Sequence, residues 1–146
     1  MSLHIASLNS GSNGNCYYIG NTNEAVLIDA GISCRETAKR MKRQGLDINR
    51  VKAIFISHEH ADHITGLPRL SKKYQIPVYI TPATFHASRI HVEVHLLHHF
   101  SPFQPARIGD LTVVSFPKLH DARDPQSFVV SGNGVTVGVF TDIGTP

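Results

Sequence analysis

The chain has 146 residues, of which 41% are hydrophobic and 17% charged, and its formal net charge is +3 at pH 7. This balance excludes an intrinsically disordered chain, and the length suits one globular domain over residues 1–146. Two cysteines are too few for a disulfide scaffold and no stretch approaches the ~18 apolar residues of a membrane span, so we expect a cytoplasmic protein with free thiols and no membrane partner.

The first third of the chain predicts an antiparallel meander of three short strands. These strands are Leu3–Leu8, Cys16–Ile19 and Ala25–Ile28. Residues 10–15, which read Ser-Gly-Ser-Asn-Gly-Asn, and residues 21–23 consist of turn-forming residues and separate the strands. Short turns of this kind join consecutive strands in antiparallel pairs.

A helix and a buried strand follow the meander. Ser33, with Glu36 three residues later, is a capping-box signature for a helix that runs to about Gln44, where Gly45 ends it. The segment Lys52–Ser57 contains a run of apolar and β-forming residues, which indicates a buried strand. The carboxyl end of this strand leads directly into a histidine-rich loop.

Strands and helices alternate through the middle of the chain, which predicts α/β character. We expect a helix over about Thr65–Tyr74, with Pro68 in its first turn, where the missing N–H costs little. Pro77–Ile80 predicts a short strand. Thr81 then caps a short helix that extends toward Arg89.

The last third of the chain is predicted to be β-structure. The expected strands are Val94–His99, Leu111–Phe116, Ser127–Ser131 and Val135–Thr141. Residues 132–134, which read Gly-Asn-Gly, predict a tight hairpin between the last two strands. The sequence contains no linker or internal repeat, which supports a single domain.

Three imidazoles and two carboxylates follow the buried strand within six residues. The segment reads His58-Glu59-His60-Ala61-Asp62-His63. Histidine and carboxylate side chains are the usual ligands of Zn²⁺ and related divalent metals, and a loop at a strand end can direct alternate residues toward one point. His58 and His60 project the same way from an extended chain, while Asp62 and His63 can reach a second position nearby. Glu59 and Ala61 need not be ligands.

This string resembles the signature of the metallo-β-lactamase superfamily, and three further residues fit the same family. Asp29, which ends an apolar strand, resembles an aspartate that supports the metal loop. His120 resembles a third histidine ligand, and Asp142 resembles the carboxylate that bridges two metals. The resemblance therefore implies six metal ligands, His58, His60, Asp62, His63, His120 and Asp142.

Residues 8–17 and 27–31 are similar to the start of the YycJ/WalJ branch of this superfamily, whose members resemble cytoplasmic nucleases. The resemblance implies an α/β fold, the αβ/βα sandwich. Because the chain ends soon after Asp142, we expect an incomplete domain with the N-terminal half and the start of the second half only. The family's final histidine would have no counterpart, the second metal position would be the weaker, and uncovered apolar surface would favour self-association.

The implied activity is metal-dependent hydrolysis. Two divalent ions, Zn²⁺ or Mn²⁺ with Fe²⁺ also accommodated, would share a bridging hydroxide that acts with Asp62 as the catalytic group. Asp142 stands where the lactamases that resemble this fold place Cys, and the N-terminus has no secretion signal. Both features favour phosphodiester hydrolysis over lactam hydrolysis, and the resemblance implies a nucleic-acid substrate.

Two other functions are compatible with the same residues. A thioester or small-ester hydrolase of the glyoxalase II type also uses a bridging aspartate. A truncated module that binds metal without turnover would explain the absence of the last ligand. Release of nucleotides from DNA, against release of thiol from an acyl-glutathione, would distinguish the two enzymes.

The remaining histidines of the second half have no coherent ligand spacing, and we expect surface or loop roles for them. They are His86, His91, His95, His98 and His99. Cys34 lies near a helix N-terminus but has no histidine partner in the sequence pattern, so we interpret it as structural.

Overall fold

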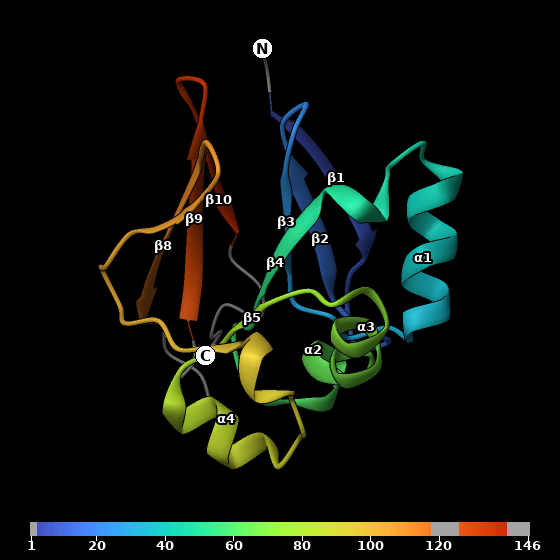
Figure 1. Ribbon diagram of the computed structural model, residues 1–146, viewed down its shortest axis with the longest axis vertical. Coiled ribbons are helices and arrows are strands. Elements are labelled where there is room, and N and C mark those ends of the chain that lie inside the picture. Colours follow the sequence, from blue (N-terminus) through green and yellow to red (C-terminus); the bar gives the residue numbers. More distant parts are fainter. Residues whose placement is uncertain (1–2, 118–125, 140–146) are drawn as a thin grey trace.

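Two β-sheets pack face to face, and helices cover the outer face of the first sheet (Figure 1). The computed structural model describes residues 3–117 and 126–139. The first sheet has six strands, hydrogen-bonded in chain order: β1 (His4–Asn9), β2 (Cys16–Gly20), β3 (Ala25–Ile28), β4 (Val51–Phe55), β5 (Val78–Tyr79) and β6 (Leu97–His98).

Strands β1 to β3 form the antiparallel meander that the turn residues predict. From β3 onward the pairing is parallel, through β4 and β5 to β6. All four residues of β3 are buried, as expected of a strand that is covered on both faces of its sheet. Because parallel strands end at the same edge, the loops after β3 and β4 lie next to each other, and this edge holds the candidate site.

The helix α1 (Cys34–Arg43) lies on the outer face of the first sheet. Ser33 begins it as predicted, since its hydroxyl accepts a hydrogen bond from the Glu36 N–H at 3.1 Å. The Glu36 carboxylate pairs with Arg40 one turn later, at 3.2 Å. Met41 and two other residues of α1 are buried against the sheet.

Three shorter helices follow β4. They are α2 (Ala61–Ile64), α3 (Leu67–Tyr74) and α4 (Pro82–Ser88). The predicted helix from Thr65 begins two residues later, because Gly66 separates α2 from α3. A Cβ atom on Gly66 would lie 1.8 Å from the carbonyl oxygen of Ile32, so the chain needs glycine where it passes the segment after β3.

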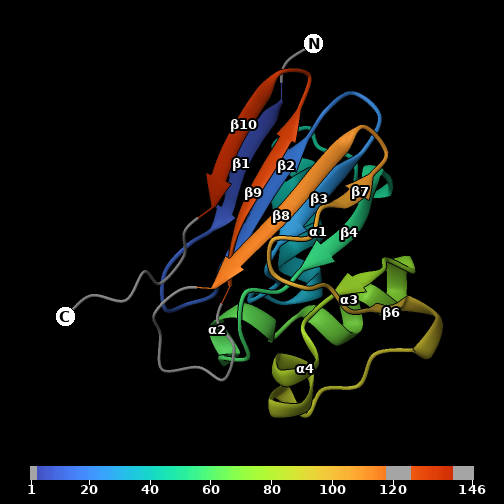
Figure 2. The ribbon, with the colours of Figure 1, turned by 90° about the vertical axis from the view of Figure 1, so that its left-hand side faces the viewer.

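The second sheet is antiparallel, with the strand order β10-β9-β8-β7. Its strands are β7 (Ala106–Ile108), β8 (Leu111–Pro117), β9 (Gln126–Gly132) and β10 (Val135–Val139). The predicted hairpin between β9 and β10 is confirmed, and its turn residues Asn133 and Gly134 have φ values of 53° and 77°. Figure 2 shows the second sheet in front of the first, with its strands running alongside β1 to β4.

The predicted strand over Val94–His99 is wrong for its first half. Val94–Leu96 forms a short 3-10 helix, and only Leu97–His98 pairs with a neighbour. The side chain of Val94 is 90% exposed, so no apolar contact holds this residue in a sheet. The neighbouring β5 offers only two residues for pairing, which limits the length of β6. The sequence also failed to predict β7 and the 3-10 helix Ile48–Arg50.

Two apolar clusters hold these layers together. One lies between the first sheet and its helices and includes Leu27, Met41 and Leu70. The other lies between the two sheets and includes Phe55 and Phe128, whose rings meet edge to face at 5.7 Å. Within the described residues, none of the helices has the length and apolar character needed to cross a membrane.

Candidate metal centre

The histidine loop, residues 57–66, leaves the carboxyl end of β4 and contains the short helix α2. His58 and His63 are fully buried, and their ring centroids lie 3.8 Å apart. The ring of His60 is half-buried and lies 4.7 Å from that of His58. The structure therefore brings the three predicted imidazoles together. Figure 2 shows α2, which this loop contains, at the lower end of the first sheet.

Asp29 connects the end of β3 to this loop. Its side chain is fully buried and accepts three hydrogen bonds, from the N–H and the hydroxyl of Ser57, both at 2.7 Å, and from Nδ1 of His63 at 2.5 Å. The φ of Asp29 is +66°, a left-handed conformation that aspartate adopts more readily than most residues. The carboxylate thus contacts the histidine loop, which the family resemblance implied that Asp29 supports.

These contacts determine which ring nitrogens carry protons. A carboxylate only accepts, so the Nδ1 atom of His63 must donate to Asp29. The Ser57 hydroxyl has one proton, which it donates to Asp29, so its oxygen accepts from Nδ1 of His58 at 2.9 Å. In the neutral rings, the second nitrogen, Nε2, then has the lone pair. Metal-binding histidines commonly have this arrangement, in which one ring nitrogen, here Nδ1, donates to an acceptor and the other binds the metal.

Asp62 approaches the same nitrogen of His63. Its Oδ2 atom lies 3.5 Å from Nε2 of His63, and its side chain is 26% exposed. The side-chain amide of Asn15 contacts both atoms, at 3.2 Å from Nε2 of His63 and 3.3 Å from Oδ2 of Asp62. Oδ2 of Asp62 and Nε2 of His63 therefore lie next to each other, and the side chain of Asn15 contacts both.

Two of the expected ligands, His120 and Asp142, lie outside the described residues. Within residues 3–117 and 126–139, no three His, Cys, Asp or Glu side chains lie close enough together to hold one metal ion. The ring of His58 lies beside those of both His60 and His63, at 4.7 and 3.8 Å between centroids, and Asp62 lies beside His63. The chemistry of these donors and the lone pairs on the two Nε2 atoms fit divalent metals, because such ions bind imidazole lone pairs and carboxylates.

The sequence interpretation missed two residues of this centre, Ser57 and Asn15. Ser57 is a small polar residue that ends an otherwise apolar strand next to the first histidine, and this position was a usable signal. Asn15 was interpreted as part of a hairpin turn only. Its contact with Asp62 spans 47 residues of the chain, and nothing local to Asn15 indicates it.

Close backbone packing explains the glycine that follows Asp29. A Cβ atom on Gly31 would lie 1.8 Å from the carbonyl oxygen of Asp62 and 2.6 Å from the backbone nitrogen of Asn15. That nitrogen donates to the Asp62 carbonyl at 2.6 Å, and the Gly31 N–H donates to the Asn15 carbonyl at 2.9 Å. Three segments distant in sequence thus meet backbone to backbone beneath the centre.

Neither cysteine forms a disulfide in the structure, and both are buried. Burial raises the pKa of the Cys16 thiol, the nearby Asp29 carboxylate raises it further, and Arg40 lowers it by a smaller amount. Cys16 is therefore held as a protonated thiol beside the centre.

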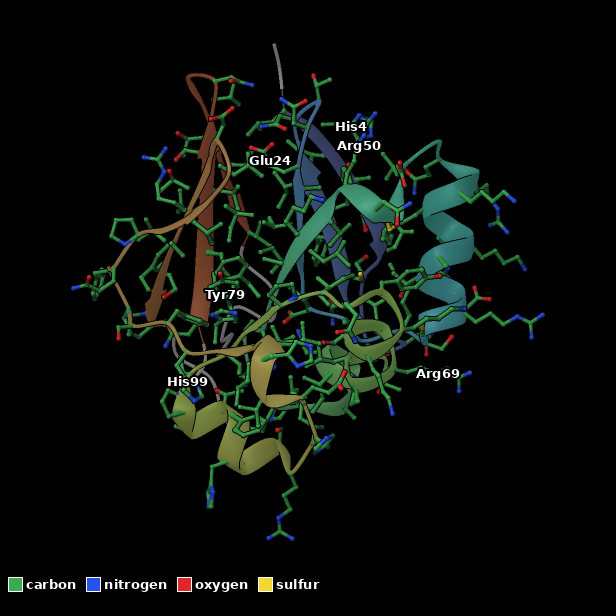
Figure 3. The ribbon with its side chains drawn as sticks, in the orientation of Figure 1. His4, Glu24, Arg50, Arg69, Tyr79 and His99 are labelled. Atoms are coloured by element: carbon green, nitrogen blue, oxygen red, sulfur yellow. The ribbon has the colours of Figure 1, made fainter. Side chains whose placement is uncertain are left out.

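Two of the other histidines have clear structural contacts. Nδ1 of His99 lies 2.8 Å from the carbonyl oxygen of Ile80, and the ring of His98 stacks on Tyr79 at 4.8 Å. Figure 3 shows His99 beside α4 and Tyr79 in the space between the sheets. Burial raises the pKa of the Tyr79 hydroxyl. Both residues are also exposed, which agrees with the surface or loop roles expected for His98 and His99.

Comparison with known proteins identifies the family. The sequence profile described as Metallo-beta-lactamase superfamily matches residues 10–145. The chain belongs to the metallo-β-lactamase superfamily. Exodeoxyribonuclease YycJ of Bacillus anthracis is 37% identical to it, over 99% of this chain and 56% of that protein. Exodeoxyribonuclease WalJ of Streptococcus pneumoniae is 30% identical, over 94% of this chain and 53% of the relative.

The chain thus spans about half the length of the curated metallo-β-lactamase relatives that it matches. Among solved structures, the metallo-β-lactamase fold protein YhfI from Bacillus subtilis aligns with a TM-score of 0.79. The alignment covers 94% of this chain and 62% of YhfI at 18% sequence identity, so it supports the fold alone. The predicted fold class, an α/β chain of the metallo-β-lactamase type, is confirmed.

Proposed function

We propose that this chain carries the metal centre of a metal-dependent phosphodiesterase that acts on nucleic acid. The observation that carries the proposal is the hydrogen-bond network in which Asp29 and Ser57 leave Nε2 as the lone-pair nitrogen of both His58 and His63. A merely structural histidine pair would not need the same nitrogen of both rings to be kept as an acceptor. Superfamily relatives with nuclease names support the substrate class.

In this proposal His58 and His60, with His120, hold a first divalent ion. Asp62 and His63 would hold a second, and Asp142 would supply a further carboxylate ligand. Bound metals would polarise the scissile group and lower the pKa of a water. Zn²⁺ and Mn²⁺ both suit this mixture of imidazole and carboxylate, and Fe²⁺ is accommodated by the same donors.

The residues of the chain itself orient the reacting groups. Asp29 orients the ring of His63 by accepting from its Nδ1. Ser57, which donates to Asp29, orients the ring of His58 in the same way. Asp62 is the catalytic carboxylate of the proposal, because its partly exposed side chain lies at the ligand nitrogen of His63 and can contact substrate. The net charge of +3 is compatible with a polyanionic substrate, although by itself it does not select one.

The test offers DNA, RNA and an acyl-glutathione to the purified chain and to His58→Ala. Short single-stranded DNA and RNA should be cleaved only when Zn²⁺ or Mn²⁺ is present, and His58→Ala should abolish cleavage. His95→Ala is the matched control, because His95 is exposed and contacts Gln75 instead of the histidine loop. This variant should cleave at the wild-type rate.

Each other outcome selects a different function. Release of thiol from an acyl-glutathione without cleavage of DNA or RNA would favour the thioesterase alternative. Metal uptake without turnover of either substrate would favour the inactive metal-binding module. Elemental analysis of the same samples identifies the metal. A cytoplasmic location, a weaker second ion and self-association stay predictions, and cell fractionation, metal titration and sedimentation test them.

A further inference from the structure

We propose that Asn15 is a positioning residue for the second metal position, where its side-chain amide holds Asp62 and His63 at the spacing of a ligand pair. The inference rests on the proposed metal centre and adds to it a residue from the first turn. Asn15 is 3% exposed and lies 47 residues from Asp62 in the chain. Its contacts therefore depend on the fold and not on local sequence.

The contacts of Asn15 fix which end of its amide is the oxygen and which is the nitrogen. Its Oδ1 atom accepts from the N–H of Gly11 at 3.2 Å and from the hydroxyl of Tyr17 at 3.4 Å. Its Nδ2 atom faces only acceptors, which are the carbonyl of Gly11, the carbonyl and Oδ2 of Asp62, and Nε2 of His63, at 3.2–3.3 Å. The two N–H groups are therefore shared among four acceptors, and two of these acceptors are the expected ligand atoms.

The spacing of those two atoms matches a shared ion. Two ligands that each bind a tetrahedral metal at about 2.0–2.2 Å lie about 3.4 Å from each other. Oδ2 of Asp62 and Nε2 of His63 are 3.5 Å apart. A carboxylate oxygen and a ring nitrogen with a lone pair have no direct attraction for each other, so a donor that contacts both is needed to hold them together. Asn15 provides this donor.

The backbone of Asn15 makes the arrangement rigid. Its N–H donates to the Asp62 carbonyl at 2.6 Å, and its carbonyl accepts from Gly31 at 2.9 Å. Because α2 begins at Ala61, this contact fixes the first turn of the helix that carries both ligands. When an ion takes the lone pair of His63, the amide keeps its contacts with Asp62. Asn15 therefore stays in place while one hydrogen bond is replaced.

The experiment titrates Zn²⁺ into wild type, Asn15→Ala and Asn15→Asp and follows heat of binding and melting temperature. Asn15→Ala should weaken the second equivalent of Zn²⁺ by about tenfold and leave the first within twofold, as expected when an outer partner of a metal ligand is lost. Asn15→Asp places a second carboxylate against Asp62. It should melt below wild type without metal and gain more than wild type when Zn²⁺ is added.

Asn13→Ala and Asn13→Asp are the matched controls, because Asn13 is exposed in the same turn. If the Asn15 and Asn13 variants respond alike to Zn²⁺, Asn15 has no role at the second position and the inference is overturned. If wild type shows no binding of Zn²⁺ at all, the proposed metal centre itself fails. A purely structural role would lower stability without separating the first equivalent of Zn²⁺ from the second.

A measurement on the wild-type chain avoids any folding defect of the variants. The side-chain NH₂ signals of Asn15 in a ¹H–¹⁵N spectrum should shift with the second equivalent of Zn²⁺ and change little with the first. Signals of Asn15 that stay unchanged through both equivalents, in a chain that binds both, would overturn the inference.

Discussion

Replacing Asp29 with Asn should change the protonated nitrogen of His63. The wild-type carboxylate accepts from Nδ1 of His63 and from the Ser57 hydroxyl through the same oxygen, Oδ2. In Asp29→Asn the other oxygen can still accept from the Ser57 N–H, which leaves an NH₂ group at the position of Oδ2. That group donates, so the favoured ring of His63 accepts at Nδ1 and carries its proton on Nε2.

The size of the effect follows from the contacts that are lost. Two hydrogen bonds to a charged group disappear, each worth about 1.5–3 kcal/mol, and the new amide contacts restore part of this. We expect the free energy of unfolding to fall by about 3 kcal/mol, which lowers the melting temperature by roughly 10 °C for a chain of this size. A proton on Nε2 also blocks metal binding, so affinity at the second position should fall at least tenfold.

Long-range ¹H–¹⁵N spectra of the histidine rings measure the tautomer directly, and calorimetric titration with Zn²⁺ measures the affinity. Asp110→Asn is the matched control, since this substitution removes the same charge and Asp110 is exposed in the turn between β7 and β8. The reasoning fails if Nε2 of His63 stays unprotonated in Asp29→Asn. It also fails if this variant and the control lose equal stability.

Three further predictions concern residues in this network or near it. Ser57→Ala removes the acceptor for Nδ1 of His58, so unfolding free energy should fall by about 1 kcal/mol and metal affinity at the first position about tenfold, measured by denaturation and titration. Gly31→Ala should cost about 3 kcal/mol or prevent folding, against about 1 kcal/mol for Gly45→Ala, whose Cβ meets nothing within 4 Å but whose φ is +74°; denaturation compares them. Cys16 should resist thiol reagents at pH 8 until the chain unfolds. Because its raised pKa keeps a proton that the unfolded chain loses, unfolding free energy should decrease as pH rises above the ordinary thiol pKa.

Local sequence signals predicted most of the first sheet. The turn residues predicted the meander of β1 to β3, and Ser33 predicted the start of α1, because a hairpin turn or a helix cap depends on a few neighbouring residues. The same reasoning was wrong for Val94–Leu96, where β-forming residues have no neighbouring strand to pair with. Strand pairing depends on partners elsewhere in the chain, which local patterns do not reveal.

The candidate site divides in the same way. The string from His58 to His63 was recognisable because its donors are adjacent in sequence, and the resemblance also indicated Asp29. The structure brings these residues together. The hydrogen bonds that orient the rings come from Ser57 and Asn15, and the contact of Asn15 could not be inferred from spacing. The sequence thus identified the types of ligand residue, whereas the structure was needed to show which ring nitrogen carries the lone pair.

This difference determines which tests separate the competing functions. Any metal-dependent hydrolase needs the same orientation of His58 and His63. Variants of Asp29 or Ser57 that no longer bind metal would therefore lose activity whether the chain is a phosphodiesterase or a thioesterase. Such variants test the centre but not the substrate. Only the comparison of DNA and RNA with an acyl-glutathione on the metal-loaded chain selects among the functions. A chain that binds two ions and cleaves neither substrate would retain the centre proposed here and refute the nuclease.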